Sequence, residues 1–139
     1  MPAKDFYHDT VVKALIDDGW EITDDPLILS YGGRELYVDL GAEKTTIAAQ
    51  KDNLKIAVEI KSFLKPSPVR DLEEAVGQYS VYQSILAETE AERILYLAVP
   101  LRSYESIFTE KLGQLILKSL KIKLLVFDDE PRRIIKWIP

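Results

Sequence analysis

Alternation between apolar and charged residues is clearest in residues 54–61. Side chains along a β-strand point to its two faces in turn, so every second residue of this run shares a face. One face is wholly apolar, and the other carries Ala57, Glu59 and Lys61. The pattern predicts a strand that is buried on one side and presents two charges beside a small residue on the other.

A second strand is predicted upstream, at residues 36–40. Its apolar residues share one face, whereas Tyr37 and Asp39 point the opposite way. If the two strands are neighbours, Asp39, Glu59 and Lys61 surround one pocket above a sheet whose far side is buried. The apolar face of this strand consists of Leu36, Val38 and Leu40.

Apolar residues recur at helical spacing in three segments, residues 5–17, 69–86 and 104–119, and predict three helices. Asp5 fits the cap of the first helix, and Gly19 fits its end. The residues expected to face inward are Val11, Val12, Leu15 and Ile16 in the first helix, Val69, Leu72, Val76, Tyr79 and Leu86 in the second, and Ile107, Phe108, Leu112, Leu115 and Ile116 in the third.

The other periodic segments predict strands. A nearly continuous apolar run at 93–100 is typical of a central strand covered on both faces, and shorter strands follow at 123–128 and 133–137. We therefore expect an α/β fold: a mixed sheet in which an antiparallel meander of about four strands joins further strands, with helices on both faces. The meander consists of strands at 27–30, 36–40, 45–50 and 54–61, with a hairpin turn at 31–34 and turns at 41–44 and 52–53.

Length and composition place the chain among single-domain proteins. The chain has 139 residues, of which 47% are apolar, so residues 1–139 are expected to form one domain with a real core. The absence of cysteine excludes disulfides, thiolate–metal sites and cysteine catalysis. No apolar run is long enough to span a bilayer, and the N-terminus lacks the layout of a secretory signal. We expect a cytoplasmic protein without a membrane partner.

The charge balance argues against a protein that coats DNA through bulk positive charge. Eighteen basic residues stand against 23 acidic ones, which gives a formal net charge of −5. A nuclease remains compatible with this balance, because bound metal ions and a local basic cluster can offset the mean. Lys61, Lys65 and Arg70 are close together in the sequence and could form such a cluster, or could be ordinary solvated residues.

Two carboxylates and an amine at this spacing match the needs of phosphodiester hydrolysis. Mg²⁺, or Mn²⁺ in its place, is held by one or two carboxylates, and it both neutralises phosphate charge and activates water. We expect Asp39 and Glu59 to be the metal ligands, with the backbone carbonyl of Ile60 as a further oxygen. Lys61 would orient the attacking water or stabilise the charge that develops on the phosphate.

Other polar residues are candidates for auxiliary roles. Gln78 on the second helix would bind the phosphate or the water, and Tyr82, four residues further on, would steady it. His8, the only histidine, is expected to be a hydrogen-bonded core residue or a ligand, and Asp9 a solvated residue or a third acid. A bare Glu-x-Lys is a weak signal, since an exposed cross-strand salt bridge gives the same pattern.

The order of these residues resembles the PD-(D/E)xK nuclease superfamily, although Val38 stands where that superfamily often has proline. Longer blocks are similar to the XisH family, the cyanobacterial controlling factors for excision of the fdxN DNA element. The similarity runs over nearly the whole chain, to residues 135–138. The blocks that carry it are Gly19-Trp20, Asp25-Pro26-Leu27 and residues 37–43, 56–63 and 95–100.

This resemblance implies a restriction-endonuclease-like core and a role in a programmed DNA rearrangement. The implied partners are DNA, a site-specific recombinase and a small companion excision controlling factor. Three interpretations stay open: a Mg²⁺-dependent endonuclease, a non-catalytic regulatory protein that binds DNA or the recombinase, and an interaction module for the companion protein alone. A homodimer is expected if both DNA strands are cut, because each chain carries one active site.

Overall fold

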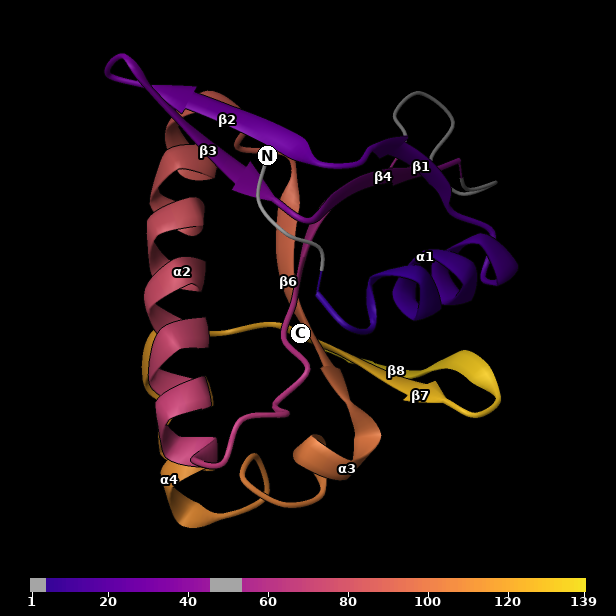
Figure 1. Cartoon of the computed structure of the whole chain (residues 1–139). Coiled ribbons are helices and arrows are strands. Elements are labelled where there is room, and N and C mark those ends of the chain that lie inside the picture. The colour runs from indigo at the N-terminus through magenta and orange to yellow at the C-terminus, as the bar shows by residue number, and fades with distance from the viewer. Residues whose placement is uncertain (1–4, 46–53) are drawn as a thin grey trace.

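A six-stranded mixed sheet forms the centre of the molecule (Figure 1). The computed structural model describes residues 5–45 and 54–139. The central pairings are parallel, and the pairings toward both edges are antiparallel, so the predicted α/β fold class is confirmed. In spatial order the strands are β1 (Glu21–Asp24), β4 (Leu40–Lys44), β5 (Leu54–Ile60), β6 (Ile94–Pro100), β7 (Leu124–Asp129) and β8 (Arg132–Ile138).

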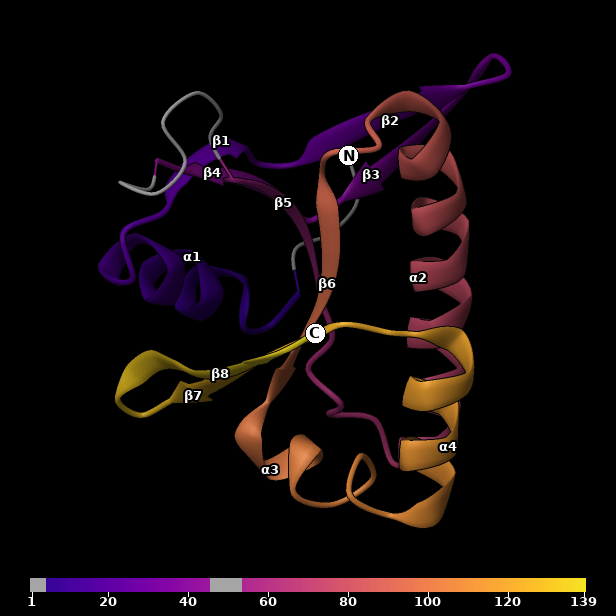
Figure 2. The ribbon, with the colours of Figure 1, turned by 180° about the vertical axis from the view of Figure 1, so that it is seen from behind.

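Helices cover the two faces of this sheet, as Figures 1 and 2 show from opposite sides. On one face lies α1 (His8–Asp17), whose Val11 and Leu15 pack into a core with residues of β4 and β5. On the other face, a second core is covered by α2 (Pro68–Thr89) and bordered by α4 (Lys111–Leu120) and the hairpin of β2 (Leu27–Tyr31) and β3 (Arg34–Val38). The short α3 (Leu101–Tyr104) directly follows β6.

The alternation predicted for β5 is present in the structure. Ile56, Val58 and Ile60 belong to the core under α1, whereas Ala57 belongs to the core under α2. Strand β6 is buried on both faces, as expected for a central strand, and pairs in parallel with both β5 and β7. The open face of β5 therefore looks toward α2.

The strand predicted at residues 36–40 is broken at Asp39, which is a bend between β3 and β4. The bend sends Val38 into the core under α2 and Leu40 into the core under α1, so the prediction that they share a face is wrong. The turn predicted at residues 41–44 is also wrong, because these residues belong to β4. Strand β4 forms backbone hydrogen bonds with β1 on one side and β5 on the other, and this pairing outweighs local turn propensity.

The expected continuous meander is interrupted by a separate hairpin. Strands β2 and β3 pair only with each other among the described residues, and β1 pairs with β4 across them. The predicted hairpin turn is confirmed: Gly32 and Gly33 have φ angles of 57° and 79°, the left-handed conformation that a two-residue turn of this kind requires. Of the strand expected at 45–50, residues 46–50 lie outside the described residues, as does the turn expected at 52–53.

The helix predicted at 104–119 begins late: α3 ends at Tyr104, residues 105–110 form an irregular segment, and α4 starts at Lys111. Ile107 and Phe108 are buried in that segment, as predicted, but Leu112 and Leu115 are exposed. Gly113 permits the arrangement, because a Cβ there would overlap the carbonyl oxygen of Ile107. Two further residues expected to face inward are also largely exposed, Ile16 and Val69.

Within residues 5–45 and 54–139, no helix combines the length and the apolar character needed to cross a membrane.

We predict opposite effects for alanine at two helical glycines. Gly113→Ala should lower the free energy of unfolding by about 1–3 kcal/mol, because the added methyl group overlaps fixed backbone. Gly77→Ala in α2 is the matched control: no atom lies within 4 Å of its Cβ position, so alanine should raise the free energy by about 0.5–1 kcal/mol. Urea unfolding followed by circular dichroism measures both, and equal effects would show that the α3–α4 packing is misplaced.

Candidate active site

A pocket of about 180 Å³ lies where the bend at Asp39 meets the end of β5. It is lined by residues from the N-terminal segment, β3, the bend, β5 and α2. Three of the residues predicted to act together, Asp39, Glu59 and Lys61, line it. The full lining is Asp5, Tyr37, Asp39, Glu59, Ile60, Lys61, Gln78 and Tyr82.

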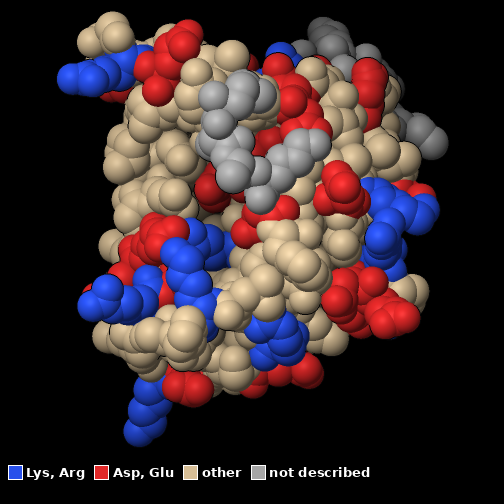
Figure 3. Space-filling model, in the orientation of Figure 1, with Lys and Arg blue, Asp and Glu red and all other residues tan. Residues whose placement is uncertain are grey.

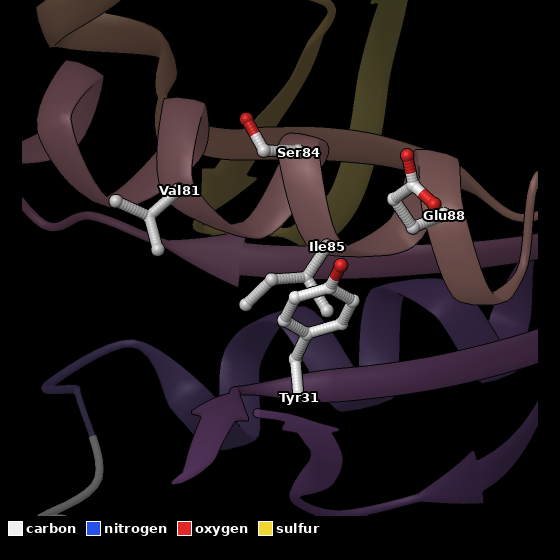
Figure 4. A pocket seen from close by; sticks show the side chains of 5 residues that line it. All are labelled: Tyr31, Val81, Ser84, Ile85 and Glu88. Carbon is white, nitrogen blue, oxygen red and sulfur yellow. The ribbon is translucent and has the colours of Figure 1, made fainter. Parts of the chain in front are cut away.

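A larger hollow of about 460 Å³ lies between the β2–β3 hairpin and α2 (Figure 4). The Tyr31 ring, Val81 and Ile85 give it an apolar wall, and Glu88 is its one ionisable acid or base. It lacks the paired acids of the smaller pocket, so we place the candidate chemistry at Asp39 and Glu59.

Both acids accept hydrogen bonds from backbone amides across the pocket, Glu59 from Asp39 and Asp39 from Ile60, the residue after Glu59. The Asp39 N–H donates to Glu59 Oε1 at 3.2 Å, and the Ile60 N–H donates to Asp39 Oδ2 at 2.8 Å. The bend makes this arrangement possible, because Asp39 belongs to neither the β2–β3 pairing nor the β4–β5 pairing and its amide is free to reach Glu59. Each carboxyl group is thereby fixed in position while the pair remains beside the pocket.

Burial makes both members of this carboxyl pair weaker acids, because it raises their pKa values. Glu59 is 7% exposed, and its removal from water, followed by the negative charge of Asp39, raises its pKa to about 9. Burial also raises the pKa of Asp39, although the hydrogen bond from the Ile60 N–H opposes the rise. The pair therefore holds a proton at neutral pH.

Lys61 follows Glu59 on the same face and reaches toward α2. Its Nζ forms an ion pair with Glu74 Oε1 and donates to Gln78 Oε1 at 3.5 Å. Lys65 Nζ contacts the second oxygen of Glu74 at 3.1 Å. The hydrogen bonds from Lys61 and then Lys65 lower the pKa of Glu74, which therefore stays ionised between the two ammonium groups.

Helix α2 supplies Gln78 and Tyr82, which lie four residues apart and both line the pocket. The neighbouring Tyr79 fixes the helix over the sheet, because its hydroxyl donates to the Leu95 carbonyl and accepts from the Lys123 N–H, both at 3.1 Å. Burial, and then the charges of Glu59 and Asp39, raise the pKa of Tyr82 to about 12. Tyr82 therefore remains a neutral hydroxyl that faces the acidic pair.

The two auxiliary residues predicted on the first helix are placed differently. His8 is buried, and its Nε2 lies 2.7 Å from Asp25 Oδ1, so it is a hydrogen-bonded core residue. Asp9 is exposed and does not line the pocket. The acid that the N-terminal segment does bring to the pocket is Asp5, which accepts hydrogen bonds from the backbone N–H of Tyr7 at 2.9 Å and of Ser62 at 3.2 Å.

Comparison with known proteins gives a family for this chain. The XisH protein family matches residues 1–135. The chain belongs to the XisH family. No curated protein matches it.

Two crystal structures resemble this XisH chain along nearly its whole length. The first is an XisH family protein from Nostoc punctiforme PCC 73102, with 38% identity, a TM-score of 0.88, and coverage of 97% of this chain and 100% of that one. The second is an fdxN element excision controlling factor protein from Anabaena variabilis, with 40% identity, a TM-score of 0.86, and coverage of 98% and 100%. The fold described above is therefore shared with both.

The donor set of this XisH chain fits a hard divalent cation. Magnesium binds to one or two carboxylates and retains several waters, so Asp39, Glu59 and the Ile60 carbonyl could hold it. A cation between the two carboxylates would also offset the repulsion that the shared proton now relieves. No group of three or more His, Cys, Asp and Glu residues within the described ranges is arranged to hold a metal, which leaves the two-acid set.

Sequence reasoning missed the placement of Asp5 and Glu74 at this site. Asp5 is 57 residues from its partner Ser62, and no local pattern links them. Glu74 could have been found, because it precedes Gln78 by four residues and therefore lies on the same flank of α2 as Gln78 and Tyr82.

The raised pKa of Glu59 predicts that Glu59→Gln stabilises the metal-free protein at high pH. The folded wild type keeps the Glu59 proton up to a pKa of about 9, whereas the unfolded chain loses it near the ordinary value of 4.5. Stability contributed by this proton is therefore full below pH 4.5 and is lost as the pH rises toward 9.

Between pH 6 and pH 8, the free energy of unfolding of the wild type should fall by about 1 kcal/mol per pH unit relative to Glu59→Gln. Urea unfolding at a series of pH values in the presence of EDTA measures the difference. A difference that does not change with pH would show that Glu59 is ionised in the folded protein.

Proposed function

We propose that this protein is a controlling factor in a programmed, site-specific DNA excision and that it acts as a Mg²⁺-dependent endonuclease. The observation that carries the proposal is the buried Asp39–Glu59 pair with Lys61 beside it in one pocket. The 40% identical relative from Anabaena variabilis is described as an fdxN element excision controlling factor protein, which supports the biological part.

The proposed site divides the chemistry among its residues. When bound, Mg²⁺, or Mn²⁺ in its place, neutralises charge on the scissile phosphate and lowers the pKa of a bound water. Asp39 and Glu59 would hold the cation through carboxylate oxygens once their proton has passed to solvent water, and the Ile60 carbonyl would add an oxygen. Lys61 donates a hydrogen bond to the attacking water or to the phosphate oxygen that gains charge.

The α2 side chains complete the proposed mechanism. The Gln78 amide oxygen lies 3.5 Å from Lys61 Nζ. From this place the Gln78 amide positions the phosphate or the water. Tyr82 stays protonated at neutral pH and steadies this group as a neutral hydrogen-bond donor. We further propose that the chain is a single restriction-endonuclease-like domain of the PD-(D/E)xK type.

The proposed partners are DNA, a site-specific recombinase and a companion excision controlling factor. A homodimer would supply two active sites, one for each DNA strand. A second candidate function is a non-catalytic regulatory protein that keeps the nuclease fold and binds DNA or the recombinase. The net charge of −5 and the ion pair that engages Lys61 with Glu74 favour this alternative.

Metal binding by the wild type should require Asp39. Titration calorimetry with MgCl₂ should show one site per chain, and Asp39→Asn should weaken binding by more than about tenfold, because an amide oxygen lacks the charge of a carboxylate ligand. Asp9→Asn is the matched control, since Asp9 is exposed and outside the pocket. Equal loss of affinity in both variants would place the metal elsewhere.

Cleavage of supercoiled DNA tests the activity itself. With Mg²⁺ or Mn²⁺ the wild type should nick the plasmid, and Lys61→Ala and Glu59→Gln should each lower the rate by at least about 10²-fold, because one removes an ammonium donor and the other a ligand charge. Asp9→Asn should cleave like the wild type. An intact plasmid with the wild type supports the non-catalytic alternative, and full cleavage by both active-site variants contradicts the residue assignment.

A further inference from the structure

The connection between β5 and α2, residues 61–67, is held in one conformation beside the candidate active site. The Arg102 guanidinium, on α3, donates hydrogen bonds to the backbone carbonyls of Ser62 and Phe63, the latter at 3.1 Å. Asp5 accepts hydrogen bonds from the Ser62 N–H at 3.2 Å and from the Ser62 hydroxyl. Phe63 has a φ of 55°, a conformation unfavourable for a phenylalanine, which these contacts maintain.

The second half of this connection is fixed by the start of α2. Asp71 is 2% exposed, and its Oδ2 accepts a hydrogen bond from the Lys65 N–H at 3.3 Å. Ser67 caps the helix by accepting a hydrogen bond from the Arg70 N–H at 3.2 Å. The backbone of Lys65 is therefore fixed relative to Lys61, although the Lys65 side chain is 65% exposed.

The two ammonium groups converge on the carboxylate of Glu74. Lys61 Nζ contacts Oε1, and Lys65 Nζ contacts Oε2 at 3.1 Å. A phosphodiester likewise presents two non-bridging oxygens that share one negative charge, so it can form the same contacts with the two lysines. Figure 3 shows Lys and Arg side chains gathered next to acidic ones near the start of α2, at the lower left of the view.

We infer that Lys61 and Lys65 form a binding site for a phosphate of the DNA backbone, and that the Glu74 carboxylate occupies this site when DNA is absent. The inference rests on the proposed function and extends it, because it assigns Lys65 to DNA binding and explains how a chain of net charge −5 presents a cationic site. Glu74 is able to leave: its side chain is 44% exposed, and its ion pair with the still more accessible Lys65, 65% exposed, is of the kind that contributes little to stability.

The site also has a fixed relation to the acidic pocket. Lys61 lines the pocket and is 13% exposed, whereas Lys65 lies on the outer side of Glu74. A phosphate bound by both lysines would therefore lie at the rim of the pocket, with the adjoining DNA backbone over Asp39 and Glu59.

Fluorescence anisotropy with a short labelled DNA duplex of mixed sequence, with calcium in place of magnesium, tests the inference. Glu74→Gln should bind DNA about three- to tenfold more tightly than Glu73→Gln, which changes the net charge equally one residue away and breaks neither lysine contact. Lys65→Ala should weaken binding several-fold and lower the slope of log K against log salt by about 1. Lys118→Ala, an exposed lysine on α4, should change neither.

The outcomes separate this inference from the proposed function. Suppose that the wild type binds and nicks DNA. If Glu74→Gln and Glu73→Gln then bind DNA equally tightly, or if Lys65→Ala binds DNA as tightly as Lys118→Ala, the lysine site is overturned and the proposed endonuclease stands. Weaker binding by Glu74→Gln than by Glu73→Gln also overturns it, because Glu74 would then support Lys61 instead of competing with DNA. If no variant binds DNA, both proposals fail.

Discussion

Two carboxyl groups buried side by side cannot both be ionised unless something offsets their repulsion, and this constraint underlies the site in the XisH chain described here. The Asp39 N–H donates to the Glu59 carboxyl and the Ile60 N–H donates to the Asp39 carboxyl, so backbone hydrogen bonds hold the two acids side by side. In the metal-free protein, burial and then the charge of Asp39 raise the pKa of Glu59 to about 9, so Glu59 keeps a proton that relieves the repulsion. A divalent cation can replace that proton, and this exchange is the physical basis of the proposed metal site.

The fold places the carboxyl pair through features that lie at different distances along the chain. The bend at Asp39 turns one continuous segment into two strands that belong to different sheets, and it thereby presents the Asp39 amide and carboxyl to the end of β5. Lys61 and Lys65 belong to the β5–α2 connection that follows. Helix α2 then places Glu74 in contact with both lysines and Gln78 in contact with Lys61. An acidic pocket and a pair of lysines result side by side: Lys61 lines the pocket, and Glu74 is paired with both lysines.

Much of this arrangement could be predicted from the sequence, because it depends on periodicity. The period of two in β5 placed Glu59 and Lys61 opposite the apolar residues, and the spacing of four placed Tyr82 with Gln78. The bend at Asp39 could not be predicted, since it depends on the pairing of β4 with both β1 and β5. The exposure of Leu112 follows from the break between α3 and α4, where the backbone around Phe108 packs against Gly113 and no local signal marks the site.

A crystal structure of the protein soaked with MnCl₂ at pH 8 tests the central claim most directly, because manganese can be located by its anomalous scattering. The account predicts one strong anomalous peak between the carboxyl groups of Asp39 and Glu59, within coordination distance of an oxygen from each. A crystal that shows no peak there, with the two carboxyl groups still bonded to the Asp39 and Ile60 amides, would contradict the claim that the pair exchanges its proton for a metal ion.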